Sequence, residues 1–324
     1  MKAIALAHDP GGANAVAATV AALRSSGAIV EAYAKGPAIR QFQRLQVTCT
    51  PIENPHLTLW SQLEGDILIA GTSQYDCFEV EGIARAKEKN IPSLAIMDYW
   101  GNYRQRFERS ETVWPDWIAA IDETCAAGIV AEGFRRDRIH ITGQPYFAWL
   151  LAHRPTQLRR QPNPPRRILF ASQPNANEIS ILKTVIEVLQ DYPPLEQLLI
   201  RFHPRQGKCR ESLELLARSG LPHAVDESLD VLSTLQKQDI VLGITSIILV
   251  EAALMGVSTG SLAIGVQNTL RSNDYGITTL LKSAEELRAF LDNNDSVRIG
   301  KQFLVQQENA DNRIYCFCYD IVRS

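Results

Sequence analysis

The chain has 324 residues, 45% hydrophobic and 21% charged, which is typical of a soluble globular protein long enough for two domains. Its formal net charge of −3 gives no broad electrostatic attraction for nucleic acid, so we expect no nucleic-acid partner. The six cysteines form no Cys-x-x-Cys pair, which argues against a zinc site or a disulfide framework and favours reduced thiols in the cytoplasm.

The start of the chain does not resemble a secretory signal, because the apolar run of residues 4–7 is short and leads into His8, Asp9 and Pro10. No apolar run is long enough to cross a bilayer. We therefore expect a cytoplasmic protein without a transmembrane segment, and any contact with membrane lipids would be peripheral.

The first predicted element is a strand over residues 2–7, followed by a loop and a helix over residues 13–25 that is rich in Ala and Val. Glycine at such a junction lets a ligand approach the backbone closely, although the full G-x-G-x-x-G pattern is absent. The loop supplies the acceptor-side candidates Gly11, Gly12 and Asn14. For Asp9 and Asn14, capping of the helix is an equally good interpretation.

Strands and helices continue to alternate through the first half. We expect strands over residues 28–34, 66–70, 93–97, 117–121 and 138–142, and helices over residues 36–46, 78–88, 123–133 and 146–153. Glu79 and Glu81 fall in the first turn of the second of these helices. The helix dipole favours acids there, and we prefer this explanation to a catalytic one.

Asp98, Tyr99 and Trp100 follow directly after the strand of residues 93–97. A carboxylate with aromatic rings at the carboxyl end of a strand is suited to binding a sugar or another polar ring. A solvated loop that its aromatic side chains anchor to the fold is the alternative, and the sequence leaves both open.

Residues 154–167 are rich in Pro and Arg and poor in apolar side chains, so we expect an interdomain linker between a first domain over 1–153 and a second over 168–324. The strand–helix pattern then restarts. We expect strands over residues 168–171, 195–202, 223–225, 239–242 and 258–263, and helices over residues 178–190, 212–219, 229–236, 247–255, 283–292 and 300–322.

A strand, a tight turn and a helix over residues 239–256 form the strongest candidate site. Thr245 and Ser246 occupy the N-cap position of the helix, where free N–H groups and hydroxyls can bind phosphate. Glu251 lies about a turn and a half further on and could accept hydrogen bonds from a sugar diol. An ordinary capped helix with a surface Glu is the plainer interpretation.

Further candidates follow two other strands of the second half. Arg201 and His203 come at the end of the strand of residues 195–202, and Ser172 and Gln173 come after that of residues 168–171. Ligands of open α/β sheets bind at this carboxyl edge. Arginine offers a bidentate fork for phosphate and histidine a donor. We therefore predict nucleotide or phosphate binding at these residues, with Arg201 free to pair with an acid instead.

The motifs His203-Pro204, Thr245-Ser246 and Glu251-Ala252 resemble those of the two-domain glycosyltransferase-B superfold. Similar families are the bacterial sialyltransferases, the CDP-glycerol or capsule polysaccharide transferases, and the UDP-N-acetylglucosamine 2-epimerase group. The resemblance implies an α/β protein with two doubly wound, Rossmann-like parallel sheets facing a cleft. In that superfold the last helix often crosses back to the first domain.

If the second domain holds a donor phosphate, the first should supply a catalytic base, and the candidates are Asp98, Asp9 and His8. No Asp-x-Asp motif lies between the halves, so we expect metal-independent chemistry with no cofactor besides a UDP-, CMP- or CDP-linked donor. Our first hypothesis is a glycosyltransferase-like enzyme of surface-glycan synthesis with a glycan or lipid-linked acceptor. The alternatives are a UDP-sugar 2-epimerase and a non-catalytic nucleotide-sugar binding protein, and fold alone does not separate them.

Overall fold

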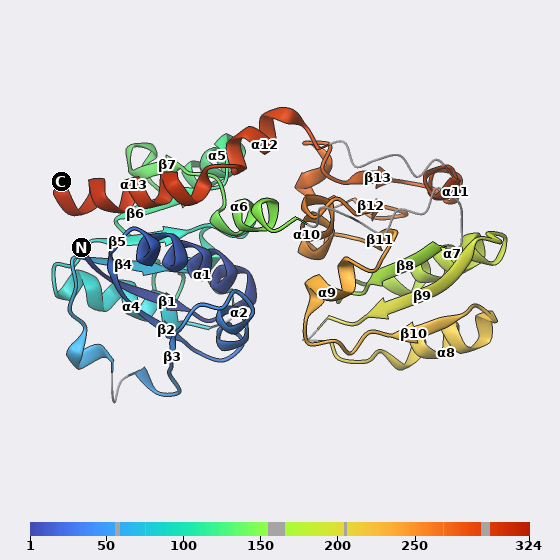
Figure 1. Cartoon of the computed structure of the whole chain (residues 1–324), viewed down its shortest axis with the longest axis horizontal. Helices are drawn as coiled ribbons and strands as arrows, with labels where there is room; N and C mark the ends of the chain where they lie inside the picture. Colours follow the sequence, from blue (N-terminus) through green and yellow to red (C-terminus); the bar gives the residue numbers. More distant parts are fainter. Residues whose placement is uncertain (56–58, 75, 155–165, 204–205, 268, 293–298) are drawn as a thin grey trace. The chain divides into compact units, whose positions relative to one another are not determined.

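The computed structural model describes residues 1–55, 59–74, 76–154, 166–203, 206–267, 269–292 and 299–324. It divides into two compact units (Figure 1). Unit 1 comprises Met1–Ala152 and Val305–Ser324, and unit 2 comprises His153–Leu304. Each unit is built on one sheet of parallel strands, which confirms the expected α/β class with two parallel sheets. Residues 155–165, most of the expected linker, lie outside the described residues.

The sheet of unit 1 has seven strands in the order β3-β2-β1-β4-β5-β6-β7. Their bounds are β1 Lys2–Ala7, β2 Ile29–Ala34, β3 Thr50–Pro51, β4 Ile67–Ala70, β5 Ser93–Ile96, β6 Trp117–Ala120 and β7 Ile139–Ile141. Every residue of β4 and β5 is buried, as expected for central strands covered on both faces. The strand order reverses between β1 and β4, and the carboxyl edge at such a reversal is where ligands of open α/β sheets bind.

The main helices of unit 1 are α1 Pro10–Ser25, α2 Ala38–Arg44, α4 Phe78–Glu88, α5 Glu123–Ala131, α6 Pro145–Ala152 and α13 Ala310–Arg323. Helix α1 packs against α2, α6 and α13 (Figure 1). It begins at Pro10, earlier than expected, because proline at the first turn fixes φ and lacks only an N–H group that would be unpaired there.

The sheet of unit 2 has six strands in the order β10-β9-β8-β11-β12-β13. The bounds are β8 Arg166–Ala171, β9 Leu195–Arg201, β10 His223–Val225, β11 Ile240–Gly243, β12 Ser258–Leu262 and β13 Thr279–Leu281. The helices are α7 Glu178–Gln190, α8 Arg210–Ser219, α9 Val231–Leu235, α10 Ile247–Leu254 and α11 Ala284–Asp292. The core gathers apolar side chains of α7, such as Ile181 and Val185, with Phe170 and Leu198 of the sheet.

The end of the chain differs from the expected single helix over residues 300–322. It forms two helices, α12 Lys301–Gln307 and α13, separated by a turn at residues 308–309. The interruption allows two side chains to bind one loop of unit 1. Gln307 Oε1 accepts a hydrogen bond from Gln144 N (2.8 Å), and Arg313 Nε donates to Thr142 O (2.8 Å). Strands β3 and β13 are short, and neither is among the strands expected from the sequence. None of the described helices is long and apolar enough to cross a membrane.

Candidate functional site

The loops after β8 and β11 are joined at the carboxyl edge of the sheet of unit 2. Thr245 N donates to Gln173 Oε1 (2.9 Å), and Gln173 Nε2 donates to Thr245 Oγ1 (2.7 Å). The two strands are direct neighbours, and a Cβ on Gly243 would lie 3.2 Å from Ala171 O, so glycine allows their close approach. One glutamine side chain thus fixes the turn that leads into α10.

Helix α10 begins directly after this turn. Ser246 is its N-cap: the backbone is extended, and the side chain accepts a hydrogen bond from Ile248 N (3.4 Å). The helix N-terminus carries partial positive charge and N–H groups that have no partner within the helix. Thr245 and Ser246 therefore lie where the sequence places them, at a turn that can bind an anion.

Ser172 and Gln173 are in turn held by a buried acid of α7. Ser172 Oγ donates to Glu178 Oε1 (2.6 Å), and Gln173 N donates to Glu178 Oε2 (2.7 Å). Burial raises the pKa of Glu178, and the two hydrogen bonds oppose that shift. Ser172 therefore supports the loop, and Gln173 links Glu178 to Thr245.

The other candidates of unit 2 are Arg201, Glu251 and His203, of which Arg201 is engaged by an acid and Glu251 is buried. The guanidinium of Arg201 forms an ion pair with Asp226 and also donates to Ser228 O (3.1 Å), so it is already engaged by an acid. Glu251 is 3% exposed, so it is a buried acid and not the surface Glu of the plainer interpretation. His203 is half-buried after β9, and its backbone oxygen accepts from Gly207 N (3.1 Å). Pro204 lies outside the described residues.

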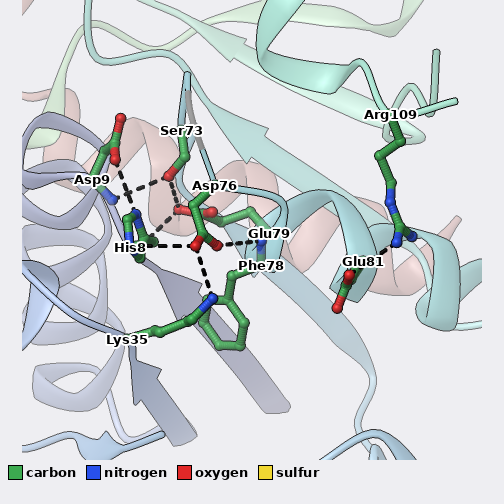
Figure 2. A network of polar contacts seen from close by, with 9 residues as sticks. All are labelled: His8, Asp9, Lys35, Ser73, Asp76, Phe78, Glu79, Glu81 and Arg109. Atoms are coloured by element: carbon green, nitrogen blue, oxygen red, sulfur yellow. Dashed lines mark hydrogen bonds and ion pairs between the residues drawn. The ribbon is translucent and has the colours of Figure 1, made fainter. Parts of the chain in front are cut away.

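A second group of polar side chains lies in unit 1, where β1, β2 and β4 end (Figure 2). We call it the His8 cluster, and its members are His8, Asp9, Lys35, Ser73, Asp76 and Glu79. The side chains of His8, Asp9 and Asp76 keep 18, 16 and 20% of their surface exposed, so solvent reaches all three.

His8 lies between two carboxylates. Its Nδ1 is 2.9 Å from Asp9 Oδ1, and its Nε2 is 3.5 Å from Asp76 Oδ2, which also accepts from Lys35 Nζ (2.8 Å). The hydrogen bond with Asp9 raises the pKa of His8, burial opposes it, and Asp76 and Glu79 raise it further. Burial would raise the pKa of Asp76, but the hydrogen bond from Lys35 and other contacts outweigh it and lower that pKa. His8 therefore keeps a proton to higher pH than a free histidine, which suits a proton donor.

Glu79 is the most deeply buried acid of the His8 cluster. It is 1% exposed, and its Oε1 accepts from both His8 N (2.8 Å) and Ser73 Oγ (2.8 Å), while Ser73 Oγ accepts from Asp9 N (3.1 Å). Burial raises the pKa of Glu79 to about 7 against the effect of these hydrogen bonds. The helix-dipole explanation given from the sequence places Glu79 in the correct turn but misses its burial and its partners.

The sequence contains a signal that could have identified Glu79. Ser73-Gln74 precedes Glu79 by the same spacing with which Ser172-Gln173 precedes Glu178, and each Ser-Gln-x-x-x-x-Glu segment joins a parallel strand to the helix that follows. In both units the serine hydroxyl donates to the buried glutamate. Each unit thus has the same serine–glutamate hydrogen bond at the carboxyl edge of its sheet.

Asp98, the first candidate for the base, is held by an ion pair. Its Oδ1 accepts from Arg106 Nη1 (2.5 Å) and from Thr72 Oγ1 (3.0 Å), and Arg106 is buried. Its Oδ2 faces Gly11, where an added Cβ would lie 1.9 Å away, and a Cβ on Gly12 would lie 2.7 Å from Thr72 N. The close approach that these glycines permit is therefore to the protein itself.

Asn14 and Trp100 are likewise engaged within unit 1. Asn14 is buried, and its Oδ1 accepts from Arg44 Nη2 (2.8 Å). Trp100 is buried and donates from Nε1 to Asp122 Oδ2 (2.6 Å). Tyr99 is half-buried with its ring edge-on to Trp100, and burial raises its pKa. Among the acceptor-side candidates, Asn14 and Trp100 are thus buried and Tyr99 is half-buried. Across the described ranges, no group of three or more His, Cys, Asp and Glu side chains is arranged to hold a metal ion.

No protein-family model matches the sequence, and no curated protein matches it. Solved structures do resemble it. The UDP-GlcNAc 2-epimerase of Neisseria meningitidis bound to UDP-GlcNAc aligns with a TM-score of 0.75 at 16% identity, over 99% of this chain and 100% of that one. The UDP-GlcNAc 2-epimerase of Methanocaldococcus jannaschii aligns with a TM-score of 0.75 at 14% identity, over 98% and 100%. The glycotransferase of kitacinnamycin aligns with a TM-score of 0.62 at 13% identity, over 99% and 98%.

Identities this low show the fold and not the activity. The resemblance stated from the sequence is confirmed at that level, since both the epimerase group and a glycosyltransferase are among the similar structures. The chain therefore has the glycosyltransferase-B type of fold that UDP-GlcNAc 2-epimerases share.

Proposed function

We propose that this chain binds a UDP-linked N-acetylhexosamine and inverts its C2 carbon, as a UDP-GlcNAc 2-epimerase does. The observation that carries the proposal is the Gln173–Thr245 pair of hydrogen bonds, which fixes the turn at the start of α10, where a helix N-terminus can bind phosphate. The similarity to several epimerases, one of them bound to UDP-GlcNAc, supports the same choice of ligand.

In this proposal the diphosphate binds at Thr245 and Ser246. Backbone N–H groups at the start of α10 and the two hydroxyls donate to phosphate oxygens, and His203 adds a donor from the loop after β9. We assign no phosphate contact to Arg201, because Asp226 already neutralises its charge. We assign no ribose contact to Glu251, because its side chain is buried.

The chemistry of the proposed reaction explains why a firm grip on the diphosphate matters. The C2–H bond of the sugar has no neighbouring carbonyl group, so it is not acidic by itself. If UDP leaves C1 with the C1–O electron pair, the C2 proton can leave and a C1=C2 double bond forms. Returning the proton to the opposite face of C2 while UDP returns to C1 gives the epimer. Donors at the phosphate stabilise the leaving UDP.

Removing and returning a proton requires a base and an acid that change charge near neutral pH. We assign these roles to the His8–Asp9 pair in preference to Asp98, which Arg106 and Thr72 already hold. His8 is partly exposed and flanked by carboxylates that favour its protonated form, so we assign it the role of proton donor.

Calorimetric titration with UDP, CMP and CDP tests the nucleotide site. We expect UDP to bind the wild type, and His203→Ala and Ser246→Ala to weaken binding roughly tenfold, because each removes one donor to phosphate. Lys183→Ala is a control on the same unit, because Lys183 lies on the exposed side of α7. The site is wrong if none of the nucleotides binds at millimolar concentration, or if both variants bind as the wild type does.

Sugar transfer, the first hypothesis from the sequence, is the second candidate, because the kitacinnamycin glycotransferase has the same fold. Products separate the two activities. Incubation with UDP-GlcNAc alone should give a second UDP-sugar if the chain is an epimerase. A transferase would release UDP only when an acceptor is added, and binding without turnover would indicate a non-catalytic binding protein.

A further inference from the structure

The two Ser-Gln-x-x-x-x-Glu segments differ in the hydrogen bonding of one oxygen atom of the glutamate, Oε2. In unit 2, each carboxylate oxygen of Glu178 accepts its own hydrogen bond, from Ser172 Oγ and Gln173 N. In unit 1, His8 N and Ser73 Oγ both donate to Glu79 Oε1. Glu79 Oε2 is buried with no hydrogen-bond partner among the residues that the structure describes. The backbone N–H that would match Gln173 N is that of Gln74, which donates to Asp9 Oδ2 (3.1 Å) instead.

This difference connects Glu79 to the turn after β1. Its Oε1 accepts from the backbone of His8 directly, and through Ser73 Oγ it also fixes the backbone of Asp9. The glutamate therefore orients the backbone of both members of the His8–Asp9 pair (Figure 2). It cannot reach a bound molecule itself, because its side chain is buried.

The charge of Glu79 also acts on His8. Among the residues that the structure describes, the titratable groups linked to Glu79 through hydrogen bonds or ion pairs are His8 and Asp9 after β1, Asp76 before α4, and Lys35 after β2, which pairs with Asp76. Glu81, two residues further along α4, pairs with Arg109 (2.9 Å), and Figure 2 shows both away from the cluster. A carboxylate at position 79 favours the imidazolium form of His8, and a neutral group there does not.

We propose that Glu79 is a positioning residue of the acid–base site: its carboxyl group fixes the His8–Asp9 turn and, once ionised, keeps His8 in the charged form that donates a proton. The role in a reaction depends on the function proposed above. The effect on His8 does not depend on it, so the two can fail separately.

The test is an NMR titration of histidine side chains in the wild type, in Glu79→Gln and in the matched control Glu81→Gln. The His8 signal is assigned by its loss in His8→Gln. We expect the His8 midpoint to fall by on the order of one pH unit in Glu79→Gln, because a nearby opposite charge is lost. Glu81→Gln removes a carboxylate of the same helix that pairs with Arg109, so the His8 midpoint in this control should match that of the wild type.

An unchanged His8 midpoint in folded Glu79→Gln would overturn the inference, whether or not the chain is an epimerase. The wild type offers a second measurement, which needs no substitution at position 79. The backbone amide of His8 donates to Glu79 Oε1, so its chemical shift should follow the ionisation of Glu79, with a midpoint near 7. An amide shift that does not change between pH 5 and 9 would also overturn it.

Enzyme kinetics give a third test of the role of Glu79. With UDP-GlcNAc, we expect kcat of Glu79→Gln to fall on the order of 10- to 100-fold with little change in KM, since the residue acts through a proton donor and not through binding. The alkaline limb of the kcat profile should move to lower pH. If the His8 midpoint moves but the wild type gives no epimer, the proposed function fails while the control of His8 by Glu79 stands.

Discussion

Glu79 should make the stability of unit 1 depend on pH in a defined direction. Its pKa rises from 4.5 in an unfolded chain to about 7 in the folded protein. Below pH 4.5 both states hold the proton. Between 4.5 and 7 the unfolded chain releases it and the folded chain keeps it, so rising pH favours unfolding. At 1.36 kcal/mol for each unit of pKa, the full loss is about 3 kcal/mol.

Tryptophan fluorescence can follow this loss in unit 1 alone, because all five tryptophans lie between residues 60 and 149. Urea unfolding of the wild type and Glu79→Gln at pH 5 and pH 8 should show the variant gaining about 2–3 kcal/mol relative to the wild type as pH rises. Glutamine resembles the protonated acid and does not ionise. Glu81→Gln, the control, should follow the wild type.

His8 changes stability in the same sense. Its raised pKa gives stability that is complete at low pH and lost as pH rises through the folded pKa. Glu79→Gln should lose less of this stability, because its His8 pKa is lower, so His8 changes the difference between the two proteins in the same direction as Glu79. If the free energies of unfolding of the wild type and Glu79→Gln change in parallel between pH 5 and pH 8, the buried acid is not held as described. The reasoning about its proton would then be wrong.

Three further predictions concern other contacts. Gln173→Ala removes both hydrogen bonds to Thr245 and should weaken UDP binding about tenfold by calorimetry. The control Gln190→Ala removes one hydrogen bond to Ser219 O and should leave UDP binding unchanged. Equal affinities of the two variants would contradict the role of the Gln173–Thr245 hydrogen bonds. Arg106→Leu leaves Asp98 without its cation and should lower the stability of unit 1 by about 3 kcal/mol in urea, with partial recovery when Asp98→Asn is added; no recovery would argue against the ion pair as the cause. Gly143 has φ +79°, and a Cβ there would lie 2.7 Å from Gln306 O of α12, so Gly143→Ala should cost about 1–3 kcal/mol of stability. A variant as stable as the wild type would show that the packing of α12 on this loop does not depend on a glycine at position 143.

The sequence predicts well where burial and periodicity decide the structure. Central strands such as β4 and β5 are mostly apolar, and α4 and α7 begin and end at the expected residues. The strand–helix alternation and the turn at Thr245 and Ser246 follow from the same local patterns. The parallel sheets could therefore be inferred from the chain alone.

Partners distant in sequence could not be predicted in this way. Arg106 lies only eight residues after Asp98, yet nothing in the sequence indicates that it will bind Asp98 in preference to solvent, and nothing near Arg201 indicates Asp226. Such choices depend on which loops the sheet order brings together. Burial of Glu79 is a similar case, because an acid in the first turn of a helix is usually exposed.

The sharpest test of the proposed activity is a proton NMR spectrum of UDP-GlcNAc incubated with the wild type in D₂O. Inversion through loss and return of the C2 proton predicts a second set of UDP-N-acetylhexosamine signals, with deuterium at C2 of the product. Glu81→Gln should give the same spectrum, and His8→Gln should give it far more slowly. An unchanged UDP-GlcNAc spectrum with wild-type protein that binds UDP would contradict the proposal that this chain is an epimerase.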